Sequence, residues 1–203
     1  QIARRYRQSG LEVQAADFVI TNGSTQAIDV IFKTFVDEGD TVFVSTPTEP
    51  RVLQVMAMYQ PEIVSLPMKG DVPDMGAVAR LFAEKQPRII YCMPDFGGPE
   101  GGRWDLETRR AMGELVKGTD CLLIEHDLYG ELSADGQRLP FVKEFAGDNS
   151  VLAGSFSQVI GPGLRCGWIC AGTPEDARNL TGTKQKTDSH MNGYMQRVLW
   201  QYL

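Results

Sequence analysis

The 203-residue sequence has few cysteines, no excess of positive charge and no long hydrophobic run, and each shortage excludes a class of protein. Four cysteines without a CxxC pair provide neither a disulfide framework nor a zinc-binding pattern, so we expect no metal site. The 20 basic and 26 acidic residues give a net charge of −6, which argues against nucleic acid as a partner. No apolar stretch approaches the ~18 residues of a membrane span, and there is no signal peptide. A reducing cytoplasm is therefore the expected compartment.

The composition that is present describes an ordinary globular chain. Hydrophobic residues make up 42% and charged residues 23%, which is enough to bury a core and excludes disorder. The length suits one sizeable domain. Both ends of the sequence fall inside amphipathic helical patterns, so we expect residues 1–203 to be one domain of something longer.

Short apolar, β-branched runs alternate with helical stretches along the chain. Runs that are apolar on successive residues, such as Ile89-Ile90-Tyr91, are typical of strands covered on both faces. The alternation predicts an α/β, three-layer sandwich with a mostly parallel seven-stranded sheet. The expected strands are 17–21, 41–45, 62–66, 88–93, 121–125, 150–155 and 166–171. The expected helices, besides one around Ile2 and Tyr6, are 24–36, 50–58, 73–83, 106–116, 174–182 and 186–203.

Polar residues follow several of these strands, at the edge where α/β folds bind their ligands. Asn22-Gly23-Ser24-Thr25 at a helix start resembles an anion cradle, although a plain helix cap has the same pattern. Ser155 and Ser157 with Arg165 add two hydroxyls and a fork-shaped cation, which suit a phosphate monoester. Strand-end polarity and a surface ion pair are the alternative. Because both groups should lie at one end of one sheet, together they favour a phosphate site.

Other polar residues near this edge have two interpretations each. His126 and Asp127 form an acid–base pair or, because adjacent residues on an extended chain point opposite ways, a structural histidine beside an unrelated carboxylate. Glu49 and Asp95 are either acids in a cleft or solvated loop charges. His190 falls in an expected helix and is interpreted as structural.

The order of these loops resembles the large domain of fold-type I pyridoxal-phosphate (PLP) enzymes. More narrowly, it is similar to class I/II aminotransferases of the 2-aminoadipate and kynurenine kind. The resemblance covers nearly the whole chain, and it implies a cofactor domain over 1–203 without the family's N-terminal arm and C-terminal small domain. The matching stretches are 19–29, 39–42, 124–132, 154–168 and 184–190.

The resemblance implies that the positions around the cofactor phosphate are retained. Tyr129 matches the family's tyrosine that hydrogen-bonds the phenolic oxygen of the ring. The positions that match the family's phosphate-binding residues are Ser24, Thr25, Ser155, Ser157 and Arg165.

Four positions expected at the cofactor ring depart from the family. Gln158 stands where the family has the lysine that forms the Schiff base, and an amide nitrogen is not nucleophilic. His126 stands where an aspartate keeps the pyridine nitrogen protonated. Gly98, in Gly98-Pro99-Glu100-Gly101, replaces an asparagine that contacts the phenolic oxygen. Glu49 replaces a tyrosine that stacks on the ring.

A degenerate aminotransferase is therefore the expected function. It would bind PLP, pyridoxamine phosphate (PMP) or another small phosphorylated molecule non-covalently, or no cofactor, and would have lost ordinary transamination. One alternative is a non-catalytic subunit of a hetero-oligomer. A second is an enzyme with altered chemistry that uses Glu49, His126 or Asp127. A third is transamination through Lys184 or Lys186. A homodimer, or a heterodimer with a related chain, is the expected assembly.

Overall fold

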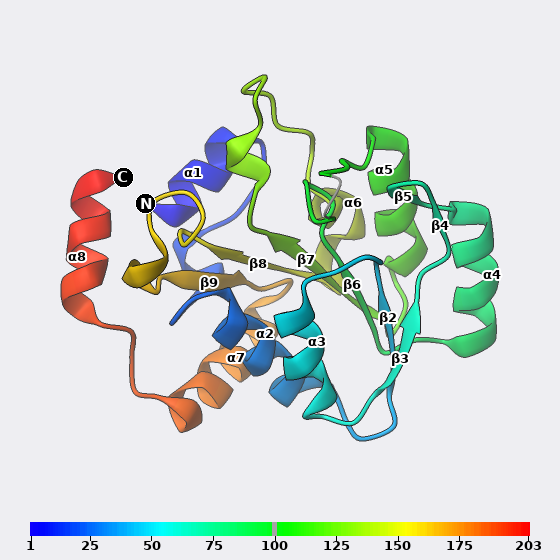
Figure 1. Ribbon diagram of the computed structural model, residues 1–203. Helices are drawn as coiled ribbons and strands as arrows, with labels where there is room; N and C mark the ends of the chain where they lie inside the picture. Colours follow the sequence, from blue (N-terminus) through cyan, green and yellow to red (C-terminus); the bar gives the residue numbers. More distant parts are fainter. Residues whose placement is uncertain (99–100) are drawn as a thin grey trace.

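A seven-stranded sheet forms the centre of the computed structural model, which describes residues 1–98 and 101–203 (Figure 1). The strand order is β1-β9-β8-β7-β6-β2-β3. Strands β4 and β5 form a separate two-stranded antiparallel hairpin. The strands are β1 Phe18–Thr21, β2 Thr41–Val44, β3 Glu62–Ser65, β4 Met68–Lys69, β5 Val72–Pro73, β6 Ile89–Cys92, β7 Leu122–Asp127, β8 Ser150–Ser155 and β9 Gly167–Cys170.

All strands of this sheet run parallel except β9, which pairs antiparallel with β1 and with β8. The prediction of an α/β sandwich with a mostly parallel sheet is thus confirmed. The carboxyl ends of β1, β2, β6, β7 and β8 meet at one edge, and the start of β9 lies there too, because Gly167 pairs with both Thr21 and Ser155. This edge carries most of the residues singled out in the sequence.

Three helices cover one face of the sheet and form the largest part of the core. They are α2 Ser24–Phe35, α3 Pro50–Ala57 and α7 Pro174–Thr187, and they lie together in Figure 1. The buried side chains of α2 follow helical spacing and pack on one parity of the strand residues, including Ile124 and Ala153. A side chain with that parity therefore faces α2.

The other face carries the remaining helices. Helices α4 Met75–Lys85, α5 Leu106–Val116 and α6 Val142–Ala146 pack on the opposite parity, which includes Leu123. Helices α1 Ile2–Gln8 and α8 Gly193–Tyr202 pack near β1, β8 and β9, around Trp168. The two ends of the chain lie side by side (Figure 1), and Arg4 Nη2 donates to the carbonyl oxygen of Leu203 at 2.8 Å. Short 3₁₀ helices occupy Ala15–Asp17, Gly130–Leu132, Gly147–Asn149 and Pro162–Leu164.

Most expected elements are confirmed within two residues at each end, but two details are wrong. The helices expected over 174–182 and 186–203 are divided elsewhere, because α7 continues to Thr187 and α8 begins only at Gly193, capped by Asn192. The sequence pattern also missed α6 and the β4–β5 hairpin, which are too short to carry a periodic signal.

All four cysteines are buried and free. No helix in the described ranges has the length and apolar character that crossing a membrane requires.

Arg109 is the largest fully buried side chain described, and it anchors the loop after β6. Its guanidinium donates to Asp95 Oδ1 at 2.5 Å and to the carbonyl oxygens of Trp104, Pro94 and Pro140. A second cation, Arg103, donates to the same carboxylate at 2.8 Å. Asp95 is therefore a buried structural ion-pair partner, so neither sequence interpretation of it, cleft acid or solvated charge, is correct.

Removing the Arg109 charge should destabilise the fold strongly. The substitution Arg109→Met removes one of the two cations on the buried Asp95 carboxylate and the side-chain donor to the carbonyl oxygens of Trp104 and Pro140, and we expect the free energy of unfolding to fall by about 3–5 kcal/mol. The control is Arg110→Met on the exposed face of the same helix, expected to cost less than about 0.5 kcal/mol. Urea denaturation of both variants measures this, and equal losses would contradict the anchoring role.

Candidate functional site

The residues predicted to bind phosphate meet at the carboxyl edge of the sheet, between the start of α2 and the loop from β8 to β9. We call this group the anion cup, and its members are Gly23, Ser24, Thr25, Ser155, Ser157 and Arg165. Ser155 ends β8 on the sheet face that α2 covers, since it shares the parity of Ala153. The cup therefore lies on the α2 face of the sheet.

Two glycines allow the cup's backbone segments to come together. Gly23 has φ +87°, and a Cβ at that position would lie 2.5 Å from Arg165 Nη2. A Cβ on Gly167 would lie 2.4 Å from the carbonyl carbon of Gly23. Arg165, itself at φ 49°, donates through Nη2 to the carbonyl oxygen of Asn22 at 2.9 Å. The guanidinium is thus held against the start of α2, with its other N–H groups free of contacts among the described residues.

The hydroxyls at the start of α2 do not cap the helix. Gly23 is the N-cap, and no side chain provides a capping hydrogen bond there. The plain-cap interpretation of Ser24 and Thr25 is therefore wrong, and the backbone N–H groups of the first turn stay available to a ligand. On the other side of the cup, Ser155 Oγ lies 2.9 Å from Ser157 Oγ and accepts from the Ser157 backbone N–H at 3.1 Å.

Asp188, at the end of α7, holds the start of α2 through hydrogen bonds that the sequence did not indicate. Asp188 Oδ2 accepts from Asn22 Nδ2 at 2.5 Å and from Gln26 Nε2 at 2.8 Å, while Lys184 pairs with Oδ1. Burial opposes the charge, but these donors keep the pKa of Asp188 below its ordinary value. Lys184 is thus committed to an ion pair. The only signal in the sequence was the resemblance of 184–190 to the family.

His126 lies on β7 and faces the α2 side of the sheet. Its Nδ1 is 2.7 Å from the hydroxyl of Tyr91, on the neighbouring strand β6. Its Nε2 is buried and has no hydrogen-bond partner among the described residues. Burial lowers the pKa of His126 from 6.5 to about 3, so the imidazole is neutral at pH 7. The sequence reasoning did not single out Tyr91.

Two further predicted residues lie near Tyr91, the hydrogen-bond partner of His126. Tyr129 is half-buried and packs on the α2 side of the core. Burial raises its pKa, and the nearby Glu49 carboxylate raises it further; Glu49 has the same effect on Tyr91. Glu49 is therefore near both tyrosines and is only partly exposed, so it is no freely solvated loop charge.

Three other predicted positions, Gly98, Gln158 and His190, have no described contact with the anion cup or with His126. Gly98 lies against Pro47, and the following Pro99 and Glu100 fall outside the described residues. Gln158 is exposed on the loop after β8. His190 is exposed and lies between α7 and α8, so its expected place in a helix is wrong. Within residues 1–98 and 101–203, no group of three metal-binding side chains comes together.

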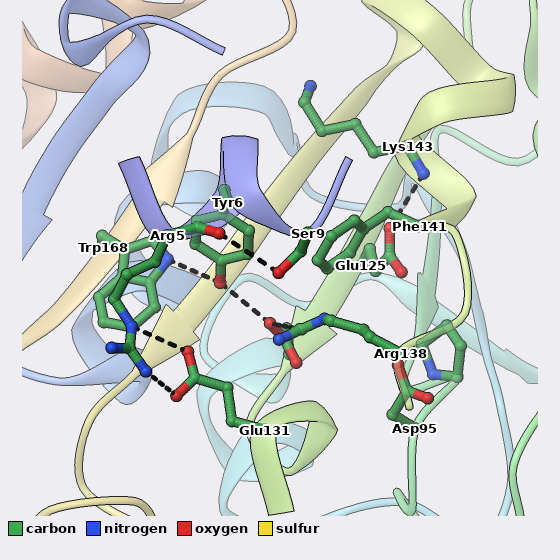
Figure 2. A network of polar contacts seen from close by, with 12 residues as sticks. Arg5, Tyr6, Ser9, Asp95, Glu125, Glu131, Arg138, Phe141, Lys143 and Trp168 are labelled. Carbon is green, nitrogen blue, oxygen red and sulfur yellow. Dashed lines mark hydrogen bonds and ion pairs between the residues drawn. The ribbon is translucent and has the colours of Figure 1, made fainter. Parts of the chain in front are cut away.

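Asp127 points to the opposite face of the sheet from His126. Tyr6 of α1 donates to Asp127 Oδ2 at 3.0 Å, and Arg138 forms an ion pair with the same oxygen. Figure 2 labels Tyr6, Arg138 and Trp168 of this network. Trp168 Nε1 donates to the Tyr6 hydroxyl at 3.1 Å. The carboxylate is buried, which raises its pKa, and Arg138 partly offsets this. His126 and Asp127 therefore do not form an acid–base pair, and Asp127 instead fastens α1 to the sheet.

Comparison with known proteins identifies the family and confirms the fold. Residues 1–201 match the family Aminotransferase class I and II. The aromatic-amino-acid aminotransferase 1 of Thermococcus litoralis is 31% identical over 199 residues, covering 95% of this chain and 48% of the relative. The α-aminoadipate aminotransferase from Thermus thermophilus, solved in complex with N-(5'-phosphopyridoxyl)-L-leucine, superposes with a TM-score of 0.89 at 30% identity, covering 98% of this chain and 52% of that one.

The chain belongs to the aminotransferase class I and II family. It spans about half the length of the curated relatives it matches. A further relative is the HTH-type pyridoxine biosynthesis transcriptional regulator of Corynebacterium glutamicum, 28% identical over 204 residues, covering all of this chain and 44% of the regulator.

Burial of a neutral His126 should make stability depend on pH. The unfolded chain takes up a proton on this side chain near pH 6.5, whereas the folded chain resists until about pH 3. The histidine's contribution is therefore present above pH 6.5 and is lost as the pH falls toward 3, by up to about 1.4 kcal/mol per pH unit. In His126→Asn this contribution is absent, so the difference in free energy of unfolding between wild type and variant should shrink over that range.

Denaturant titrations at several pH values measure this difference. Burial also raises the pKa of Glu125 to about 7, which acts in the opposite direction, but Glu125 is present in both proteins and cancels. The matched control is His190→Asn at the exposed position, whose stability should follow that of the wild type. Parallel profiles for wild type and His126→Asn would rule out a buried neutral imidazole.

Proposed function

We propose that this chain binds a small phosphorylated ring compound, PLP or PMP, without a covalent bond, and that it does not carry out ordinary transamination. The observation that carries the proposal is the combination of an intact anion cup with a glutamine at position 158. Membership of the aminotransferase class I and II family supports the choice of ligand. So does the phosphopyridoxyl compound bound to the similar Thermus thermophilus enzyme.

The cup's donors fit a phosphate group. Backbone N–H groups at the start of α2, the hydroxyl of Ser157 and the guanidinium of Arg165 all carry hydrogen-bond donors at one edge of the sheet. The Ser155 hydroxyl donates to Ser157 Oγ or to the carbonyl oxygen of Cys166 and so orients the Ser157 side of the cup. Arginine recognises phosphate through its planar fork, and the α2 dipole favours a negative charge at this end. In this proposal Ser24 and Thr25 add their hydroxyls to the same group.

The ring of the ligand would lie between the anion cup and the side chains of His126 and Tyr91. Tyr129 and Glu49 would face its substituents, and Gly98 would leave the phenolic oxygen without the family's amide donor. When bound, PLP supplies an aldehyde and an electron-withdrawing pyridine ring. The protein's own part would be to hold the phosphate, orient the ring and exclude water from the His126 side.

Gln158 sets the limit on chemistry. Covalent attachment needs a nucleophilic amine, and the side-chain amide of glutamine has none. The described contacts favour no substitute, because Lys184 is paired with Asp188 and Lys186 is exposed on α7. We therefore propose that the chain holds its ligand as a sensor or carrier. The relative named as a regulator of pyridoxine biosynthesis is compatible with that use of the fold.

Two further readings remain open in this proposal. Altered chemistry in the same cleft would rely on Glu49 or His126, which lie close to Tyr91 and Tyr129. Asp127 is removed from it by its place on the opposite face. A homodimer, or a heterodimer with a lysine-bearing relative, stays a prediction.

Titration of the chain with PLP tests the proposal directly. We expect saturable binding, followed by the absorbance of the ligand, and at least a tenfold weaker affinity for Arg165→Met, because a charge-assisted bond to phosphate is lost. Inorganic phosphate should compete. Equal affinity of wild type and Arg165→Met would mean that PLP binds elsewhere.

Restoring the amine separates non-covalent from covalent binding. After borohydride treatment and denaturation, the wild-type chain should release all its ligand, whereas Gln158→Lys should retain a pyridoxyl group on residue 158, located by peptide mass analysis. The matched control is Val159→Lys, one position further along the loop, which should retain none. A pyridoxyl group on any lysine of the wild type would overturn the non-covalent reading.

A further inference from the structure

The buried Nε2 of His126 is the polar atom whose isolation most needs an explanation. The side chain is 1% exposed, and Nε2 has no partner among the described residues. A buried polar group without a hydrogen bond destabilises the fold, so native proteins rarely keep one without a use. Its strand position gives the direction: His126 shares the α2 face with Ser155, whose hydroxyl belongs to the anion cup.

The contact with Tyr91 decides which ring nitrogen carries the proton. Burial raises the pKa of Tyr91 well above its ordinary value, so its hydroxyl keeps a proton that needs an acceptor. The hydrogen bond assigned to that hydroxyl in the described structure is with His126 Nδ1, at 2.7 Å. If Nδ1 accepts, the proton of the neutral imidazole is on Nε2 and only that N–H is left without a partner. The buried Thr48 hydroxyl lies beside Tyr91 and donates to its oxygen, which directs the tyrosine proton to Nδ1. The other tautomer would turn the tyrosine proton toward Thr48 and leave the Thr48 proton and the Nε2 lone pair unused.

We propose that His126 presents an Nε2–H donor to a bound aromatic ring and so selects ligands whose ring has an uncharged acceptor nitrogen at that position. This rests on the proposed function, since the anion cup fixes the ligand's phosphate and thereby places its ring. The described contacts provide the donor, its orientation through Tyr91, and the absence of any competing acceptor at Nε2.

The chemical consequence is the reverse of what an aspartate produces. A carboxylate accepts a hydrogen bond from a protonated ring nitrogen and so favours a charged pyridinium. A neutral N–H donor needs the lone pair of the ring nitrogen as its acceptor, so it favours the unprotonated ring. Asp127, the next residue on the strand, is on the opposite face and engaged with Tyr6 and Arg138, so it does not counter this effect. Glu49 is the carboxylate on the α2 side, and it acts on Tyr91 and Tyr129. The ring held here would therefore be neutral and a weak electron sink.

Ligand analogues that differ only at the ring nitrogen test the inference. We expect the chain to bind PLP about tenfold more tightly than its carbocyclic analogue, which has C–H in place of the nitrogen. The N-methyl analogue, with a fixed positive charge and no lone pair, should bind more weakly still. The ¹⁵N NMR signal of PLP labelled at the ring nitrogen should report an unprotonated nitrogen in the complex.

Two variants connect these preferences to His126. In His126→Phe the donor is gone, so PLP and the carbocyclic analogue should bind equally. In Tyr91→Phe the tautomer is no longer fixed, so the preference should fall while the histidine remains. Affinity for inorganic phosphate should match the wild type in both, which shows that the cup, and with it the fold, is intact.

The outcomes separate this inference from the proposed function. Phosphate and PLP binding without discrimination among the analogues, or a protonated ring nitrogen in the wild-type complex, would overturn the role of His126 and leave the cup standing. Failure of both phosphate and PLP to bind would overturn the proposed function and the inference with it.

Discussion

The pleat of β7 determines the character of the whole site. Three ionisable residues follow one another on this strand, and alternation places Glu125 and Asp127 on one face and His126 on the other. Glu125 accepts the backbone N–H groups of Val142 and Lys143 at the start of α6, and Asp127 binds Tyr6 and Arg138. Both carboxylates are thus used to attach helices. The α2 face receives only a neutral imidazole.

The contacts that shape the anion cup do not depend on the side chain of residue 158. The cup depends on close backbone approach, with Gly167 packed on Gly23 and Arg165 held by Asn22. Gln158, in contrast, is a single exposed side chain on a loop, so its identity has little effect on folding. The geometry of the cup and the identity of residue 158 can therefore vary independently.

Local patterns in the sequence were sufficient for the fold, and they singled out residues that meet at one edge of the sheet, whereas phosphate binding there stays a prediction. Continuous apolar runs identified the parallel strands, and the rule that ligands bind at carboxyl ends directed attention to Ser24, Ser155 and Arg165. The sequence could not show which distant residues complete the site. Asp188 reaches the start of α2 from the end of α7, and Tyr91 meets His126 across two strands. Contacts of that kind leave no periodic signal. The same applies to Asp95, because its partners Arg103 and Arg109 follow it by 8 and 14 residues and form no periodic pattern with it.

The antiparallel strand β9 gives the cup a particular place in the folding of the chain. Arg165 directly precedes β9, which lies between β1 and β8, while Gly23 and Ser24 directly follow β1. The two halves of the cup therefore meet only after the last strand has inserted between the first strand and its parallel neighbour, a long-range closure that is slow to form. An anion bound across them would contact both residues 23–25 and residues 155–165. It would find no complete binding site in any partly folded form that lacks β9. Binding of an anion to the cup would then raise the free energy of global unfolding by mass action, and its effect would not be limited to the mobility of one loop.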